Sequence, residues 1–565
     1  MKEFRCFGPP GCGKTTKLAT DWIPQAIAKF GTDKIMVVSF TRTAALKIAN
    51  QRSRKTGLTI EISPESVGTL HSICFHALGS PKIIETEKAM LARWNEQVKD
   101  AYMIGSGFSV SAVDNVYQET GGGSMGGDQI LSIINIKRNK MIDEQFWPPK
   151  ARRFYRKWQQ FKLENDIIDF TDLIDKALKE IIYAPGHPKV IFVDEAQDST
   201  KLQLSLIRSW GQHCEWIVLV GDDDQAIFQW AGASPDAFLD PPVDDKFKTV
   251  LKQSYRVPQA VLNRALKIIS KVDHREPKIY KPRIDWFTGK PAPGTIYENN
   301  ANWRHPQELL PLITDYIKDD KTVMVLASCG YMLDPIKNQF KEQGIAFHNP
   351  YRLTRGDWNP LKTSGNGVSA TAILTSFLSN GIDEPYWNVP QFLIWANFLT
   401  TTGEAGLKRK IGKAGLAALK QAVEDNQPGL HTTREVLDQV LKPEAIEPAI
   451  ARNTTWLNAN LQSRRQNAFE YPLKVFKRYG LEAIEETPRL IIGTIHSVKG
   501  EESDVILLFP DISWQAKDQM EASSEERDSV YRMFYVAMTR AKEELILCQP
   551  AKRGVHSVPT QFVRL

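Results

Sequence analysis

The stretch Gly8-Pro-Pro-Gly-Cys-Gly-Lys-Thr-Thr16 decides the fold, because it has the G-x-x-x-x-G-K-T pattern of a phosphate-binding loop. A short apolar run from Phe4 to Phe7 precedes it, as expected for the strand that leads into such a loop. Glycines let backbone N–H groups close around a polyphosphate, while the lysine reaches the β and γ oxygens and the threonine hydroxyl binds Mg²⁺. The helix expected from Thr16 through Trp22 would direct its positive N-terminal end at the same phosphates. The stretch therefore predicts a nucleotide site.

An acidic motif far downstream supplies the partner that such a loop requires. The apolar, strand-like run Lys189-Val-Ile-Phe-Val193 ends in Asp194-Glu195-Ala-Gln-Asp198. A carboxylate at the carboxyl end of a strand beside the loop is well placed to hold Mg²⁺, and the next carboxylate can position water. The alternative is a buried strand capped by solvated acids. The two motifs together predict a nucleoside triphosphatase with Lys14, Asp194 and Glu195 as catalytic residues and Thr15 and Asp194 as metal ligands.

Composition narrows the class of protein. The 565 residues exceed what one core can hold and suggest three or four domains, with 42% hydrophobic and 24% charged residues as in globular proteins. The formal charge of +6 permits a nucleic-acid partner without requiring one. The six cysteines are scattered without C-x-x-C spacing, which suits a reducing compartment and disfavours a disulfide framework or a zinc site.

The expected location is cytoplasmic, with nucleoid association if the source is prokaryotic. The chain enters the strand before Gly8 almost at once, so we expect no signal peptide. No apolar run is long enough to cross a bilayer, so we expect no membrane partner.

The hydrophobic pattern predicts an α/β fold with two parallel-sheet cores, each interrupted by a mainly helical insertion. Strand-like runs occur at 34–39, 67–72, 190–194, 216–220, 322–327, 490–493 and 504–508. The helical blocks at 81–186 and 351–486 separate the strands of each core. We find no internal repeat.

Further motifs follow strands in both halves of the chain. They are Ser39-Phe-Thr-Arg-Thr-Ala-Ala45, Val220-Gly-Asp-Asp-Asp-Gln-Ala-Ile-Phe-Gln-Trp-Ala-Gly-Ala233, Leu251-Lys-Gln-Ser-Tyr-Arg256, Ile492-Gly-Thr-Ile-His-Ser-Val-Lys-Gly-Glu-Glu502 and Phe534-Tyr-Val-Ala-Met-Thr-Arg-Ala541. In this order, from end to end, the chain resembles the UvrD/Rep group of superfamily 1 (1A) DNA helicases. The resemblance implies ATP and Mg²⁺ as cofactors and 3′–5′ translocation along single-stranded DNA. It also implies RecA-like P-loop motor domains 1A (1–80 and 187–250) and 2A (251–350 and 487–565), with insertions 1B (81–186) and 2B (351–486).

The resemblance assigns the remaining nucleotide contacts. Gln225 matches the residue that senses the γ-phosphate, and Arg256 and Arg540 match arginine fingers, which can be worth about 10³–10⁵ in rate. A surface ion pair is the alternative for each arginine. Tyr255 is similar to the residue that stacks on the base, and Glu502 to one that touches the ribose. The expected nucleotide-binding residues are Gly8, Pro9, Pro10, Gly11, Cys12, Gly13, Lys14, Thr15, Thr16, Tyr255, Gly500 and Glu502.

The first DNA contact implied by the resemblance is Trp230, which matches a tryptophan that stacks on a base. The alternative interpretation is that Trp230 lies in the hydrophobic core. Histidines more often serve as structural hydrogen bonders than as ligands. The other residues matching the strand-lining positions are Phe40, Thr41, Arg42, His71 and His496.

Two basic segments have two interpretations each, and one acidic segment has one. The run Arg152-Arg-Phe-Tyr-Arg-Lys-Trp158 suits a nucleic-acid backbone or a solvated amphipathic helix. The segment 408–415, with Lys410 and Gly412, resembles the family's turn that grips duplex DNA, or is an ordinary basic helix and turn. We interpret Asp169-Phe-Thr-Asp-Leu173 as structural.

The chain departs from the family pattern at four places. It lacks the upstream glutamine segment that reads adenine, so selectivity for ATP is open. Ala231 stands where the family has arginine, and Glu501 and Ser503 replace the usual leucine and aromatic residue. We expect no nuclease domain after residue 541.

Three functional hypotheses follow. The first is an ATP-dependent 3′–5′ DNA helicase in replication, repair or recombination, acting on single strands and single-strand/duplex junctions with an unidentified loading partner. The second is a translocase that strips proteins from single-stranded DNA but unwinds weakly. The third is a nucleotide-switched DNA-binding protein.

Overall fold

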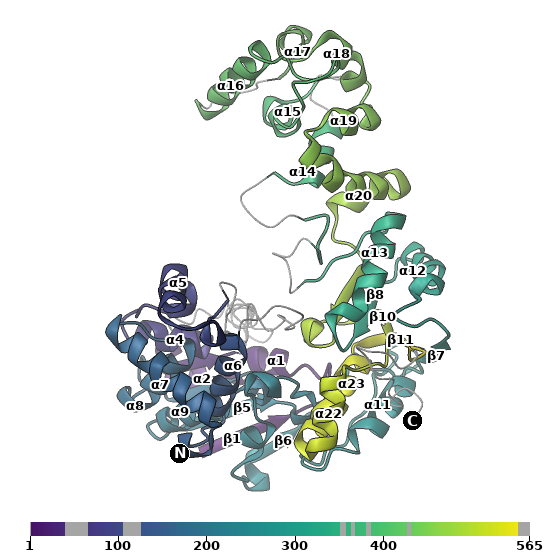
Figure 1. Ribbon diagram of the computed structural model, residues 1–565. Helices are drawn as coiled ribbons and strands as arrows, with labels where there is room; N and C mark the ends of the chain where they lie inside the picture. Colours follow the sequence, from purple (N-terminus) through teal and green to yellow (C-terminus); the bar gives the residue numbers. More distant parts are fainter. Residues whose placement is uncertain are drawn as a thin grey trace. The chain divides into compact units, whose positions relative to one another are not determined.

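The computed structural model describes residues 2–39, 66–105, 126–350, 357–362, 368–379, 386–425 and 431–551 (Figure 1). The chain divides into two compact units. The first contains Met1–Asn299 and Lys499–Leu565, and the second contains Asn300–Val498. The predicted boundaries of 1A, 1B, 2A and 2B stay a prediction.

A six-stranded parallel sheet forms the core of the first unit, in the order β3-β2-β4-β5-β1-β6. Its strands are β1 (Lys2–Phe7), β2 (Ile35–Val38), β3 (Val67–Gly68), β4 (Val190–Val193), β5 (Trp216–Gly221) and β6 (Lys248–Val250). β2 and β4 are apolar and fully buried along their length, as in parallel sheets covered on both faces. Because all the strands are parallel, the P-loop after β1 and the acids after β4 meet at the same edge.

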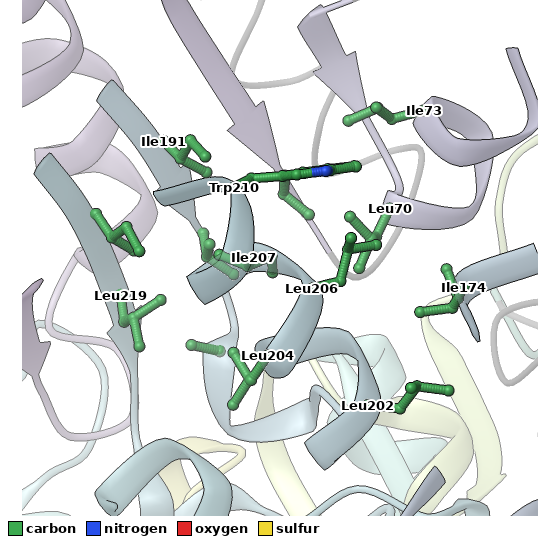
Figure 2. Close-up of a cluster of buried hydrophobic side chains, with 14 of the residues drawn as sticks. Leu70, Ile73, Ile174, Ile191, Leu202, Leu204, Leu206, Ile207, Trp210 and Leu219 are labelled. Atoms are coloured by element: carbon green, nitrogen blue, oxygen red, sulfur yellow. The ribbon is translucent and has the colours of Figure 1, made fainter. Parts of the chain in front are cut away.

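Alternate residues of these strands supply two hydrophobic cores, one on each face of the sheet. Ile191 packs on the face covered by α4 (Leu70–Ala77), α8 (Phe170–Glu180) and α9 (Lys201–Gly211). Figure 2 shows Trp210 of α9 lying across this core. The other face is covered by the helix after the P-loop, which runs through α1 (Lys14–Lys17), a π-helical turn (Leu18–Trp22) and α2 (Ile23–Phe30).

Helices α8 and α9 begin with reciprocal capping boxes that fix where they start. Asp169 accepts a hydrogen bond from the backbone of Asp172, whose side chain accepts one in return. Thr200 and Gln203 make the same exchange at α9. Each pair satisfies N–H groups that a helix start leaves without partners. Asp169 and Asp172 also form buried ion pairs, in agreement with a structural role for that motif.

The helical block after residue 81 has a separate aromatic core. It contains α5 (Lys88–Gln97), α6 (Gly126–Asn139) and α7 (Pro149–Glu164). Phe154 and Trp158 of α7 pack edge-on against Trp94, with ring centroids 5.5 and 4.9 Å away. The cations Arg153, Arg156 and Lys157 are exposed. This arrangement favours the amphipathic-helix interpretation of 152–158.

A further set of parallel strands in the first unit comprises β7 (Thr295–Asn299), β11 (Ala541–Cys548) and β10 (Ser503–Leu508). They lie with α11 (Gln259–Ile269), α22 (Trp514–Ala522) and α23 (Ser524–Met538), while α10 (Pro235–Leu239) lies near the first sheet. These strands bring residues 499–502 and 540 into the same unit as the P-loop. Segments far apart in sequence thus meet in one unit.

The second unit contains the parallel strands β8 (Val323–Ala327) and β9 (Leu490–Thr494). Aromatic side chains dominate its helical part, where Phe377, Trp387 and Trp395 lie within 4.9–6.0 Å of one another. The helices are α12 (Leu309–Lys318), α13 (Asp334–Gln343), α14 (Ala370–Leu378), α15 (Val389–Ala396), α16 (Ile411–Glu424), α17 (Arg434–Val440), α18 (Pro443–Ile450), α19 (Thr454–Asn460), α20 (Ser463–Tyr479) and α21 (Glu482–Glu485).

The observed elements confirm the predicted class, an α/β protein with two parallel-sheet cores and extensive helical blocks. The strand-like runs at 34–39, 190–194, 216–220, 322–327, 490–493 and 504–508 all contain strands, whereas the run at 67–72 is extended only at Val67–Gly68 because helix α4 begins at Leu70. Within the described ranges, no helix combines the length and apolar character needed to span a bilayer.

Candidate nucleotide and nucleic-acid site

The P-loop turns sharply at two glycines that other residues would strain. Gly11 and Gly13 have φ of 72° and 74°, in the left-handed region. A Cβ on Gly11 would lie 2.4 Å from the Cβ of Arg256, and one on Gly8 would lie 2.4 Å from Cys12 Sγ. The loop therefore requires glycine for its turns and for the close approach of a second segment.

Lys14 lies buried in the loop, where its Nζ donates a hydrogen bond to Gly8 O at 2.9 Å. Burial alone would lower its pKa, but Cys12 and the carboxylates of Glu195 and Asp222 raise the pKa overall. The side chain is therefore a fixed positive charge inside the loop. This is the chemistry needed to bind β and γ oxygens.

Thr15 and Asp194 form the predicted metal site, and their geometry suits Mg²⁺. Thr15 Oγ1 donates to Asp194 Oδ2 at 2.8 Å. Asp194 Oδ1 is buried and has no hydrogen-bond partner among the described residues. Burial, with the nearby Glu195 charge, raises the pKa of Asp194 to about 7. Mg²⁺ is usually held by one or two protein ligands together with phosphate oxygens and water, which this pair could supply.

Glu195 is held in an unusual conformation beside this site. Its backbone has φ 53°, and Gln197 Nε2 donates to its Oε2 at 2.5 Å. Burial opposes its charge, yet Lys14 and Lys499 lower the pKa of Glu195, so the side chain is a carboxylate at neutral pH. Left-handed strain at a non-glycine residue costs about 1–3 kcal/mol and is concentrated at functional sites. The geometry suits a group that orients water.

Gln225 lies between an acid and an arginine. Its Nε2 donates to Asp222 Oδ2 at 2.8 Å, and its Oε1 accepts from Arg540 Nη2 at 3.0 Å. Arg540 is buried and also donates to Val536 O at 3.0 Å. The structure therefore brings the predicted sensor and one predicted arginine finger into direct contact.

Residues 254–256 contact the P-loop from outside. The Tyr255 N–H donates to Gly11 O at 2.8 Å, and Ser254 Oγ donates to Pro10 O at 2.7 Å. The Tyr255 ring is 71% exposed, so one face is free for a base. Arg256 Nε pairs with Glu502 Oε2 at 2.5 Å, next to Gly500 with its φ of 98°. Four predicted nucleotide contacts from two segments are thus brought together.

Two sets of contacts at the site escaped the sequence reasoning. Lys499 Nζ pairs with Asp198 and donates to Gln225 O at 2.7 Å. Burial, although opposed by Lys499, raises the pKa of Asp198 to about 7. Lys278 and Tyr280 bind the acids that precede Gln225. The buried acids themselves signalled that cations were required, but nothing in the sequence pattern identified which cations.

The predicted DNA contacts of the first unit differ in environment. Trp230 is 44% exposed in the short 3₁₀ turn Gln229–Ala231, so it is not a core tryptophan. His71 packs edge-on against Phe170 at 5.9 Å, and burial lowers its pKa to about 4. The ring is therefore neutral at pH 7, and both interpretations of His71 stay open. Phe40, Thr41 and Arg42 lie outside the described residues.

In the second unit, His496 occupies a 3₁₀ turn (His496–Val498) after β9. Lys410 is exposed at the N-cap of α16, whereas Gly412 is buried in its first turn. A Cβ on Gly412 would lie 2.4 Å from Val440 O, so close packing against α17 accounts for this glycine. The basic helix start remains available for a phosphate, and both interpretations of 408–415 stay open.

Comparisons with known proteins agree with these motifs. The UvrD/REP helicase N-terminal domain matches residues 6–245, and the UvrD-like helicase C-terminal domain matches residues 474–551. A probable DNA helicase II homolog of Mycoplasma pneumoniae is 22% identical over 483 residues, covering 74% of this chain and 63% of the relative. The ATP-dependent DNA helicase PcrA of Staphylococcus aureus is 24% identical over 475 residues, covering 73% and 63%. The chain therefore spans somewhat less than two thirds of the length of these relatives.

Proposed function

Because the chain belongs to the UvrD/Rep-like helicase family, we propose that it is an ATP-dependent DNA helicase that moves 3′ to 5′ on single-stranded DNA and unwinds duplexes. Its proposed setting is replication, repair or recombination, with single-strand/duplex junctions as substrate. One observation carries the proposal. Lys14, Glu195, Gln225, Arg256 and Arg540, from segments hundreds of residues apart, surround one P-loop in the first unit.

In the proposed reaction these residues position the attacking water and neutralise the negative charge of the phosphates. Thr15 and Asp194 would hold Mg²⁺, which when bound neutralises phosphate charge. Glu195 orients or deprotonates the attacking water. Gln225 and Arg540 act as one hydrogen-bonded unit at the γ-phosphate, so loss of that phosphate changes the environment of both. Buried donors of this kind are effective because they need no reorganisation during the reaction.

Coupling to DNA runs through a short segment. Gln225 and Trp230 are five residues apart in the loop that follows β5. A base stacked on Trp230 can therefore shift the loop that holds Gln225. Stacking contributes about 1–3 kcal/mol per base without sequence preference, which suits translocation on any sequence.

Steady-state hydrolysis tests the proposal directly. ATP turnover is measured alone, with single-stranded DNA and with RNA, and the series is repeated with GTP. We expect strong stimulation by DNA alone. Absence of stimulation, with a folded protein and saturating DNA, would overturn the motor proposal and favour the nucleotide-switched binding protein. Equal turnover of GTP would show that Tyr255 stacking does not select adenine.

Trp230→Ala tests the coupling step. We expect single-stranded DNA to bind about 1–3 kcal/mol more weakly and to lose most of its stimulation of hydrolysis. Trp286→Ala removes a more exposed tryptophan (81%) that belongs to none of the predicted motifs and is the matched control. Equal behaviour of the two variants would remove Trp230 from the DNA contacts.

Ala231 favours a second candidate, a translocase that displaces bound proteins but unwinds weakly, since the usual arginine beside the stacking tryptophan is missing. Strand displacement and streptavidin displacement from the same biotinylated DNA distinguish the two. Efficient unwinding by the monomer would reject the translocase.

A further inference from the structure

Three consecutive acids precede the γ-phosphate sensor, and all three are buried. Asp222, Asp223 and Asp224 follow β5 and have no exposed surface. Uncompensated carboxylates at such depth would be strongly destabilising. Lys278 Nζ lies 3.0 Å from Asp222 Oδ1 and 3.2 Å from Asp224 Oδ2, and it also binds Asp223. Arg275 Nε donates to Asp224 Oδ1 at 2.8 Å. The two cations that face these three acids therefore come from one segment, 275–280.

Tyr280 fixes the orientation of the Asp222 carboxylate through a hydrogen bond. Its buried hydroxyl lies 3.1 Å from Asp222 Oδ1 and 2.9 Å from Asp224 Oδ2. Asp222 Oδ1 is thus held by Lys278 and Tyr280, which leaves Oδ2 to accept from Gln225 Nε2 at 2.8 Å. With both oxygens engaged, the carboxylate cannot rotate without breaking a buried hydrogen bond.

The backbone of Asp222 is also connected to the water-orienting acid. Its N–H donates to Gln197 Oε1 at 2.9 Å, and Gln197 donates in turn to Glu195. A shift of Asp222 therefore reaches Gln225 through its side chain and Glu195 through Gln197.

The segment that holds Asp222 is joined to the arginine-bearing segment as well. The Ser254 N–H donates to Lys281 O at 2.9 Å, and the Lys281 N–H donates to Lys252 O at 2.7 Å. The Arg283 N–H donates to Val257 O at 2.7 Å. Residues 278–283 thus form a bracket that binds the sensor loop with side chains and residues 252–257 with backbone.

We propose that Tyr280 and Lys278 are positioning residues for hydrolysis. They fix the side chain of Asp222, so that Gln225 and Glu195 face the γ-phosphate. The same segment holds Arg256 in place relative to them. This inference rests on the proposed function. A purely structural bracket would compensate charge and nothing more. The Tyr280 hydroxyl separates the two roles, because it carries no charge and its removal leaves every ion pair in place.

Tyr280→Phe in the full chain is the test. We expect kcat for DNA-stimulated ATP hydrolysis to fall about tenfold while KM for ATP changes less than twofold. In a Gln225→Ala background the same substitution should lower kcat by a smaller factor than in the wild type, since only the path through Gln197 to Glu195 remains. Unchanged kcat, or an equal fall in both backgrounds, would overturn the inference.

Tyr471→Phe is the matched control, since it removes another buried hydroxyl, one that donates to Ile345 O at 2.8 Å in the second unit. It should lower the melting temperature without changing kcat. If Tyr280→Phe does not fold, Gln253→Ala removes the side-chain contact of Gln253 with Pro282 O and tests the same bracket. That variant should lower kcat severalfold at constant KM, and an unchanged kcat would count against the bracket. A wild-type protein without DNA-stimulated turnover would instead reject the proposed function.

Discussion

Two acidic runs lie side by side in the first sheet and serve opposite purposes. Asp194 and Glu195 follow β4, and Asp222–Asp224 follow the neighbouring parallel strand β5. Both runs are acids at the carboxyl end of a buried strand. At the first run, Asp194 Oδ1 has no partner within the described part of the chain, and the nearby cations are those of the P-loop and Lys499. At the second run, Lys278, Arg275 and Tyr280 occupy the carboxylates.

The difference lies in which cations reach the acids and from where. An acid that keeps a free oxygen beside a phosphate-binding loop is ready for a metal and a substrate. An acid that a distant segment has already neutralised can only hold its neighbours in place. The same sequence signature therefore yields a reactive site or an anchor. The distinction predicts that substitutions at the first run lower turnover without loss of stability, whereas removing the cation that pairs with the second run lowers stability as well.

The largest expected effect is at Glu195. Glu195→Gln should reduce ATP turnover by about 10²–10⁴-fold, because the amide cannot accept a proton from water. Nucleotide binding, measured with a fluorescent ATP analogue, and the melting temperature should both stay near wild type. Near-normal hydrolysis would remove Glu195 from its role and weaken the contrast between the two runs.

Lys278 tests the opposite side of the comparison. Lys278→Met leaves buried carboxylates without their main cation and should cost about 3–5 kcal/mol of unfolding free energy in urea titrations. Lys179→Met, which breaks an exposed pair with Asp175, is the matched control and should cost less than about 1 kcal/mol. Similar losses of unfolding free energy in the two variants would mean that Asp222–Asp224 are stable in the interior without Lys278. That result would contradict the structural role proposed for this run.

The sequence was enough to place the phosphate-binding loop and the strand before Asp194, because each pattern is local. The P-loop spacing and the strand before Asp194 are each contained in about ten residues, whereas the hydrophobic pattern placed β4, β5 and β10 but missed β6, β7 and β11. The resemblance implied a role for Gln225 and for Arg540 but not their contact, since 315 residues separate them. Side-chain partners across such distances depend on how the sheet is assembled, which periodicity does not specify.

Residues 278–283 illustrate more clearly that hydrophobic periodicity does not specify distant side-chain partners. Lys278 and Tyr280 lie in a proline-rich passage that reads as a loop, and nothing in its composition marks a buried cation. The interpretation of 152–158 stayed open for a related reason. Cations and aromatics alternate in sequence, but only the helix geometry separates the buried Phe154 and Trp158 from the exposed cations.

Glu85, a half-buried acid whose Oε2 is inaccessible to solvent, extends the comparison because no cation pairs with it among the described residues. Its Oε1 accepts from the Phe170 N–H at 3.2 Å, and its Oε2 is buried without a partner among the described residues. Burial, reinforced by the charge of Asp169, raises the pKa of Glu85 to about 8, above its value of 4.5 in the unfolded chain. The folded protein therefore retains this proton to higher pH than the unfolded chain. The resulting stability is complete below pH 4.5 and is lost as the pH rises to about 8.

Glu85→Gln keeps the acceptor for Phe170 and removes the titration. Relative to wild type, the variant should gain stability between pH 5 and 8 by at most about 1.4 kcal/mol per pH unit, and the gain should then level off. Melting temperatures measured from pH 5 to 9 check this, with the exposed Glu164→Gln as control. Parallel pH profiles for Glu85→Gln and wild type would mean that Glu85 is ionised in the fold. In that case an acid in the interior of this protein could remain charged without a cation. The ion pairs of Lys278 with Asp222–Asp224 would then no longer distinguish a structural run of acids from a reactive one.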